Sequence, residues 1–252
     1  PDANERRAAE MSVGAGIVYD SDARTEYQEC LLKARFLTGV APGFALFETI
    51  HATRDGCALL DRPMKRLVSS ATSLGFRVDD TELRTRIAAE CATLDQGRDY
   101  RLRVALDANG SVQLQAAPVT RLAQPVRVLL SPRRMPSGDP LLAHKTTLRQ
   151  TYDEGWQAAE AAGAFDSLFF NERGELTEGG RSNVFVRVGG RWLTPPLSSG
   201  LLPGVMRAQL LADPDWNAVE QTLTLQDLRD ADAICVCNAL RGVLAAQVVW
   251  PG

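Results

Sequence analysis

Residues 100–118, YRLRVALDANGSVQLQAAP, are the part of the sequence that most restricts the fold. Apolar and polar side chains alternate on both sides of Asn109-Gly110. An Asn-Gly pair favours the tight turn between two antiparallel strands, and alternation with a period of two is typical of strands. This segment therefore predicts a β-hairpin, and a fold that contains antiparallel sheet.

Helical periodicity precedes and follows this hairpin. Amphipathic helices are predicted over residues 62–75 and 79–94, the second of which begins with an Asp-Asp-Thr-Glu cluster typical of a helix N-terminus. An alanine-rich helix is predicted from about Leu148 to Ala162. Further strands are predicted at residues 44–50, 57–60, 126–132, 166–171 and 233–240. Helices mixed with largely antiparallel hairpins predict an α+β fold in two lobes.

The linker from Thr38 to Gly43 contains two glycines and a proline and predicts a boundary. We therefore expect three parts: residues 1–40, a small α/β lobe at residues 41–130, and a large lobe at residues 131–252. The length of 252 residues suits one large domain or two modest ones.

Charge and cysteine usage exclude several classes of protein. The net charge is −3 without a long basic block, which argues against a nucleic-acid partner. No apolar run reaches the length of a membrane span, and the first ten residues are too polar for a signal peptide. We therefore expect a soluble, cytoplasmic protein. The five cysteines include no C-x-x-C pair and the two histidines lie far apart, so no metal site is predicted.

Lysine occurs only at Lys33, Lys65 and Lys145 in this arginine-rich chain. Lys33 and Lys65 fit the polar faces of predicted helices, where a lysine is solvated. Lys145 follows a long loop rich in proline and glycine and stands between His144 and Thr146. A lysine at such a junction is a candidate for a Schiff base, although a solvated side chain is the simpler alternative.

Three other features suit a phosphorylated pyridine cofactor. Glu178 precedes two glycines, so it could pair with a ring nitrogen or lie in a solvated turn. Pro203-Gly204 comes directly before a predicted helix, whose free N–H groups favour a phosphate. Arg66 lies on a helix from which it could reach a phosphate or simply extend into solvent.

These features occur in an order that resembles the class IV aminotransferases, the pyridoxal-phosphate enzymes of fold type IV. The matching segments, from about Phe44 to the C-terminus, are FETI, LLDRPMKRLVSSATSLGF, HKTT, LTEGGRSNVFV, LLPGVMR and CNAL. The chain departs from the family at Pro63, where histidine is frequent, and it shows no clear counterpart of the usual N-terminal strand before Phe44. The resemblance implies a two-lobed α+β enzyme that holds the cofactor between its lobes, usually as a homodimer.

The resemblance also assigns roles to individual residues. It implies that Lys145 is the catalytic Schiff-base lysine and that Glu178 is the partner of the ring nitrogen. The phosphate is assigned to Arg66 and to two backbone segments. These segments are Val205 with Met206, and Asn238 with Ala239.

Within the family, the chain looks most like the aminodeoxychorismate lyases. CNAL, HKTTLRQTYD and Arg149, four residues after the lysine, favour this branch. The branch converts 4-amino-4-deoxychorismate to 4-aminobenzoate and pyruvate, a step toward folate. This small-molecule substrate carries two carboxylates, for which we select Arg149, with Thr147 and Tyr152 as further candidates. Two alternatives stay open: a transaminase acting on a branched-chain or D-amino acid, and a degenerate domain that stabilises a fused synthase.

Residues 14–34, GAGIVYDSDARTEYQECLLKA, resemble the C-terminal end of chorismate-binding synthases such as aminodeoxychorismate synthase component I. Glu26 and Glu29 match glutamates at the magnesium site of those enzymes. Because the rest of that domain is absent, we expect neither magnesium nor chorismate to bind to this segment. The resemblance implies a remnant of a synthase that is fused to the lyase in a longer polypeptide.

Overall fold

The computed structural model describes residues 43–250. Residues 44–252 group into one compact unit, separate from residues 1–43. The predictions for residues 1–40, including those for Glu26 and Glu29, lie outside the described residues. No helix in residues 43–250 is long and apolar enough to cross a membrane.

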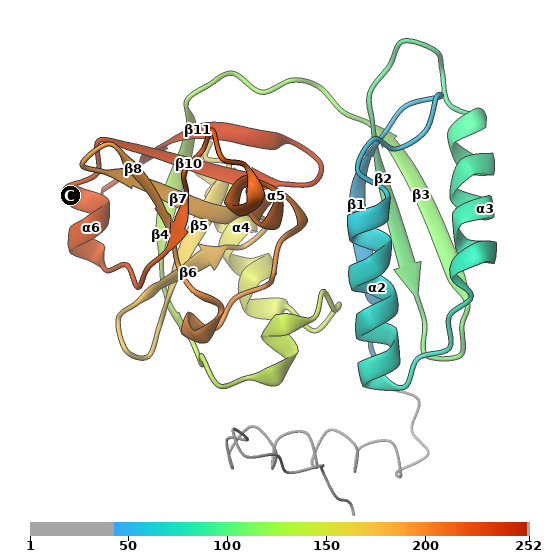
Figure 1. Cartoon of the computed structure of the whole chain (residues 1–252), viewed down its shortest axis with the longest axis horizontal. Helices are drawn as coiled ribbons and strands as arrows, with labels where there is room; N and C mark the ends of the chain where they lie inside the picture. The colour runs from blue at the N-terminus through green and yellow to red at the C-terminus, as the bar shows by residue number, and fades with distance from the viewer. Residues whose placement is uncertain (1–42, 251–252) are drawn as a thin grey trace, which may run out of the picture. The chain divides into compact units, whose positions relative to one another are not determined.

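The first lobe contains a three-stranded antiparallel sheet in the order β1-β2-β3. Its elements are β1 (Leu46–Ala52), α2 (Asp61–Leu74), α3 (Asp80–Ala92), β2 (Tyr100–Leu106) and β3 (Val112–Pro118). Helices α2 and α3 run along the sheet (Figure 1). They share one core with it, to which each element contributes fully or partly buried apolar residues, among them Ile50, Leu67, Ile87, Leu102 and Leu114.

The predicted hairpin is confirmed as β2 and β3, and Gly110 has the positive φ of 92° that its turn requires. The predicted strand at residues 57–60 is wrong. Seven residues of β1 pair with β2 instead, from Leu46 opposite Leu106 to Ala52 opposite Tyr100. Residues 57–60 form a turn into α2, because the chain reverses at Gly56 and β2 offers β1 a longer partner.

The second lobe contains an eight-stranded mixed sheet in the order β6-β5-β4-β11-β10-β7-β8-β9. Its strands are β4 (Val126–Met135), β5 (Asp166–Asn171), β6 (Leu176–Gly179), β7 (Asn183–Val188), β8 (Arg191–Thr194), β9 (Val219–Glu220), β10 (Ala233–Asn238) and β11 (Gly242–Val248). Its α-helices are α4 (Gln150–Ala161), α5 (Val205–Ala212) and α6 (Leu225–Arg229). Strand β4 runs through residue 130, and residues 119–125 connect the two sheets.

Helix α4 packs closely on β5 because Gly155 has no side chain. A Cβ atom at this position would lie 2.4 Å from Cζ of Phe169 on β5. The rings of Phe169 and Tyr152, the latter on α4, meet edge to face with centroids 5.0 Å apart. This contact sets the position of Tyr152 relative to the sheet.

Residues 145–147 run along the beginning of β1 and connect the two lobes. The N–H of Phe47 donates to the carbonyl of Lys145 at 2.9 Å, and the N–H of Thr147 donates to the carbonyl of Ala45 at 2.9 Å. Oγ1 of Thr147 accepts from the N–H of Ala45, also at 2.9 Å. The backbone of Lys145 is therefore held against the small sheet, although the residue belongs to the large lobe.

Candidate active site

Lys145 lies in a sheltered and strongly charged environment. Its Nζ lies 3.7 Å from Oε2 of Glu48 and 5.1 Å from the ring centroid of Phe47. Burial lowers the pKa of Lys145 to about 7; Glu48 opposes this shift, and the nearby arginines, among them Arg66, add to it. A large fraction of the amine is therefore neutral near pH 7, as a nucleophile or a general base requires.

Glu48 and Arg66 form a buried ion pair beside Lys145. Nε of Arg66 donates to Oε1 of Glu48 at 2.8 Å, and Nη2 donates to Oε2 at 2.6 Å. Nη1 of Arg66 donates to the carbonyl of Pro203 at 3.0 Å, which brings the guanidinium to the beginning of α5. An arginine has five N–H groups, so two remain for an anion.

Glu48 was not selected from the sequence as a site residue. It is only 1% exposed and contacts both Lys145 and Arg66. The available signal was an acidic residue within the largely apolar strand FALFETI. Such a residue needs a buried partner, but the sequence does not show which cation supplies it.

The beginning of α5 has the features of a phosphate site. No side chain caps the helix, so in the described part of the chain the first-turn N–H groups of Val205 and Met206 are available to an anion. A Cβ atom at Gly204 would lie 1.7 Å from Oδ1 of Asn183, so only glycine fits here. The free N–H groups and the nearby guanidinium of Arg66 suit the phosphate of the predicted cofactor.

Glu178 lies on β6 and is 6% exposed. Its Oε1 accepts from the hydroxyl of Tyr152 at 2.9 Å and from the N–H of Leu202 at 3.0 Å. Its Oε2 accepts from Nδ2 of Asn183 at 3.1 Å and keeps room for another donor. Burial raises the pKa of Glu178 to about 7 despite these donors. A positively charged donor, such as a protonated pyridine nitrogen, would hold the carboxylate ionised.

Asn238 and Ala239 lie where β10 turns into β11. Oδ1 of Asn238 accepts from the N–H groups of Leu240 and Arg241, at 3.1 and 2.8 Å. Its Nδ2 donates to the carbonyl of Arg181 at 3.0 Å. The side chain of Asn238 therefore shapes this turn, which leaves the backbone as the part that can face a phosphate.

The three residues selected for the substrate also make contacts within the protein. Nε of Arg149 donates to Oδ1 of Asp153 at 3.0 Å, and Nη2 donates to the carbonyl of Gly180. Thr147 bonds to the beginning of β1, and Tyr152 bonds to Glu178. Arg149 alone of the three keeps several N–H groups without a partner in residues 43–250.

Arg103 was not selected from the sequence, but its side chain lies over the same aromatic ring as that of Lys145. Its guanidinium lies 4.0 Å from the ring centroid of Phe47, which also has Lys145 at 5.1 Å and Arg149 at 5.6 Å. We call Arg103, Lys145 and Arg149 the Phe47 cation cluster. Burial and the charges of Arg149 and Arg101 lower the pKa of Arg103. Within residues 43–250, its side chain forms no hydrogen bond or ion pair, so it is available to an anion.

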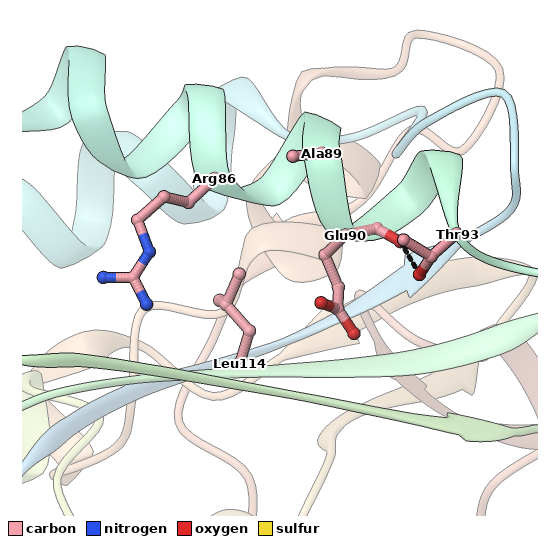
Figure 2. Close-up of a pocket in the computed structure, with 5 residues that line it drawn as sticks. All are labelled: Arg86, Ala89, Glu90, Thr93 and Leu114. Atoms are coloured by element: carbon pink, nitrogen blue, oxygen red, sulfur yellow. Dashed lines mark hydrogen bonds between the residues drawn. The ribbon is translucent and has the colours of Figure 1, made fainter.

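A hollow of about 400 Å³ lies elsewhere, between α3 and β3. Figure 2 shows Arg86 and Glu90 on the helix, Thr93 directly after it, and Leu114 on the strand. The hollow is open to solvent, and its lining includes none of the residues around Lys145. It does not form part of the candidate active site.

Comparisons with known proteins identify the family of this chain. Residues 45–249 match the family model of amino-transferase class IV, and residues 3–39 match that of the chorismate binding enzymes. A protein of Schizosaccharomyces pombe, assigned as an aminodeoxychorismate lyase, is 30% identical over 213 residues, which cover 81% of this chain and 89% of the relative.

Solved structures show the same fold. One is assigned as an amino-acid aminotransferase from Mesorhizobium loti. It is 35% identical, with a TM-score of 0.75, and the match covers 82% of this chain and all of that one. Another is assigned as a 4-amino-4-deoxychorismate lyase from Legionella pneumophila. It is 24% identical, with a TM-score of 0.71, over 81% of this chain and 82% of that one. The chain belongs to the class IV aminotransferases, the pyridoxal-phosphate-dependent enzymes of fold type IV.

Proposed function

We propose that this protein is a pyridoxal-phosphate-dependent lyase that converts 4-amino-4-deoxychorismate to 4-aminobenzoate and pyruvate. The observation that carries this choice of substrate is the Phe47 cation cluster, in which Arg103 and Arg149 lie over the same ring as the reactive amine of Lys145. A substrate with two carboxylates complements that charge, whereas an amino acid with an apolar side chain brings only one.

In this proposal, different residues bind different parts of the cofactor. Arg66 and the N–H groups of Val205 and Met206 would hold the phosphate, with the backbone of Ala239 on the other side. Glu178 would hold the ring nitrogen, and Lys145 the carbonyl carbon. When bound, the cofactor supplies an electron sink that stabilises negative charge on the neighbouring substrate carbon.

Lys145 is the proton acceptor in this mechanism. Its neutral amine takes the proton from the ring carbon that bears the substrate nitrogen. Glu48, 3.7 Å away, stabilises the ammonium that results, while the nearby arginines favour its return to the neutral form. Loss of this proton and departure of the enolpyruvyl group aromatise the ring. The proton ends on the pyruvate that leaves.

Arg103 and Arg149 bind the substrate carboxylates in this proposal. Arg103 has no competing partner in residues 43–250, so we assign it the principal contact. Arg149 is oriented by Asp153 and Gly180 and contributes its remaining N–H groups. Thr147 acts mainly through its bonds to β1, by which it holds the segment that carries Lys145.

The comparisons support the lyase reaction from two directions. The Schizosaccharomyces pombe relative is assigned this activity. The match to chorismate binding enzymes at residues 3–39 joins the class IV domain to a segment of enzymes that act on chorismate. With this function we propose fusion to aminodeoxychorismate synthase component I, assembly as a homodimer, a cytoplasmic location and a place in folate synthesis.

A transaminase is the second candidate, because the Mesorhizobium loti structure is assigned as an amino-acid aminotransferase. A branched-chain aminotransferase of Methanocaldococcus jannaschii, also an assignment, is 30% identical over 94 residues. The degenerate-domain alternative is weaker, because Lys145, Glu178 and Arg66 are all present. Glu178 is buried, Lys145 is partly buried, and both have shifted pKa values.

Product analysis tests these functions. We expect the purified protein with cofactor to form 4-aminobenzoate and pyruvate in equal amounts from 4-amino-4-deoxychorismate. Arg103→Gln should raise KM about tenfold or more, since a charged hydrogen bond contributes about 1.5–3 kcal/mol. Arg98→Gln, at an exposed arginine of the same lobe, serves as the control. A keto acid formed from branched-chain or D-amino acids, without 4-aminobenzoate, would establish the transaminase; no reaction at all would favour the degenerate domain.

A further inference from the structure

Three donors from three different segments hold the carboxylate of Glu178. They are the hydroxyl of Tyr152 on α4, the N–H of Leu202 in the loop before α5, and Nδ2 of Asn183 on β7. Oε1 accepts two of these bonds, while Oε2 accepts only one. The two oxygens of this buried group are therefore not equivalent.

Tyr152 cannot easily turn from Glu178 toward a substrate. Its side chain is buried, and its ring is held edge to face against Phe169. Gly155, the next turn of the same helix, allows this close contact between α4 and β5. Burial, followed by the negative charge of Glu178, raises the pKa of Tyr152 well above its ordinary value, so the hydroxyl stays protonated and remains a donor.

We propose that Tyr152 is a positioning residue for Glu178, whose Oε1 it holds so that Oε2 is presented to the ring nitrogen of the cofactor. This inference rests on the proposed pairing of Glu178 with that nitrogen. It replaces the candidate role of Tyr152 in binding substrate. The tyrosine acts through the carboxylate and touches neither substrate nor cofactor.

The same hydrogen bond favours the ionised form of Glu178. Burial raises the pKa of this carboxyl and so does the charge of Asp166 on β5, whereas Tyr152, Leu202 and Arg149 lower it. A hydrogen bond to a charged group is strong enough that its loss shifts a pKa by about one to two units. Without the hydroxyl, Glu178 would be mostly protonated at neutral pH and could not stabilise a protonated ring nitrogen.

Titration of Glu178 in the protein without cofactor tests directly whether the hydroxyl of Tyr152 stabilises the ionised carboxylate. The variant Tyr152→Phe keeps the aromatic ring but removes the hydroxyl. Carbon NMR of labelled glutamate carboxyl groups follows the titration, and the Glu178 signal is identified by its loss in Glu178→Gln. We expect the midpoint for Glu178 to rise by about one to two pH units. The matched control is Tyr100→Phe, which removes another buried hydroxyl, 3.0 Å from Asp95 in the small lobe. An unchanged midpoint in Tyr152→Phe would overturn the proposal.

A second variant is expected to lower the titration midpoint of Glu178 instead of raising it. Incorporation of 3-fluorotyrosine at position 152 makes the phenol a stronger donor without removing it, so the midpoint for Glu178 should fall. This variant also allows the test if Tyr152→Phe does not fold. Near-ultraviolet circular dichroism shows whether Tyr152→Phe folds. A higher or unchanged titration midpoint in this variant would contradict the proposed role of Tyr152.

Cofactor binding separates this inference from the proposed function. We expect Glu178→Gln and Tyr152→Phe both to weaken cofactor affinity and to change the pH dependence of its absorption, with the larger effect in Glu178→Gln. If Glu178→Gln has no effect, the assignment of Glu178 to the ring nitrogen fails. If Glu178→Gln has an effect and Tyr152→Phe has none, the positioning role fails while the proposed function stands.

Discussion

Glu48 is a buried acidic residue that contacts two cationic side chains, those of Arg66 and Lys145. It neutralises Arg66 through two hydrogen bonds and lies within 3.7 Å of Lys145. Its charge favours the protonated amine, in opposition to the burial and the neighbouring arginines that favour the neutral one. The reactivity of Lys145 therefore depends on a residue more than ninety positions away in the sequence.

Replacement of Glu48 by glutamine should lower the pKa of Lys145 below its present value of about 7. Loss of an adjacent opposite charge shifts a pKa by about one unit or more. Since the neutral amine forms above the pKa, the rate at which pyridoxal phosphate attaches covalently should reach half its maximum at a lower pH. Stopped-flow absorbance over a pH series measures this midpoint.

Glu154→Gln provides the control for this prediction, because Glu154 is exposed on α4 and bonds only to Gln150 within residues 43–250. Its midpoint should equal that of the unchanged protein. A midpoint for Glu48→Gln at the same or a higher pH would show that Glu48 does not stabilise the charged lysine.

At the scale of elements, the N-terminus of α5 and the strand β7 meet at one point. Gly204, directly before α5, packs against Asn183, which in turn bonds to Glu178 and to the carbonyl of Leu202. The phosphate end and the ring-nitrogen end of the proposed cofactor site are thus coupled through one side chain. We therefore expect a change at one end to affect the other.

Gly204→Ala should disturb both ends of the site. The new Cβ would lie 1.7 Å from Oδ1 of Asn183, so the helix or the asparagine must move. Such overpacking costs about 1–3 kcal/mol, and a similar loss in binding weakens cofactor affinity about tenfold or more. Urea unfolding and a cofactor titration measure the two effects.

The matched control is Gly43→Ala, where a new Cβ meets no atom within 4 Å and φ is not positive. We expect its stability and cofactor affinity to stay close to those of the unchanged chain. If Gly204→Ala behaves in the same way, the close packing of Gly204 against Asn183 is not what holds this part of the site.

At the scale of the whole molecule, the contacts described above that build the site lie within residues 43–250. Residues 44–252 contain both sheets, the segment that joins Lys145 to β1, and all the residues proposed to hold the cofactor. A domain with its own core is expected to fold by itself. We therefore expect the catalytic unit to fold without residues 1–42.

A chain that begins at Gly43 should bind pyridoxal phosphate with unchanged affinity. Its thermal midpoint should lie within about 4 °C of that of the full chain, which corresponds to roughly 1 kcal/mol for a domain of this size. Absorbance titration and calorimetry compare the two chains. Loss of cofactor binding in the shorter chain would show that the first 42 residues complete the site or its fold.

Local patterns were enough to predict many elements of the fold. The hairpin over residues 100–118 and the helices now seen as α2, α3 and α4 all lie within about two residues of their predicted positions. Turn chemistry and periodicity operate over a few neighbouring residues, so they can be read from the sequence. The strand at residues 57–60 failed because its partner was judged by proximity, whereas β1 pairs with a strand about fifty residues later.

The sequence by itself determined the family and the cofactor, because an ordered set of motifs carries that information, and the scarcity of lysine made Lys145 the proposed Schiff-base residue. Only the tertiary structure decided which groups surround it. Arg66 reaches Pro203 across 137 residues, and Tyr152 reaches Glu178 across 26. Spacing cannot reveal such pairs, nor that Arg103 and Lys145 lie over the same ring of Phe47. Burial and opposing charges, which set the pKa of Lys145 near 7, exist only once both sheets are packed.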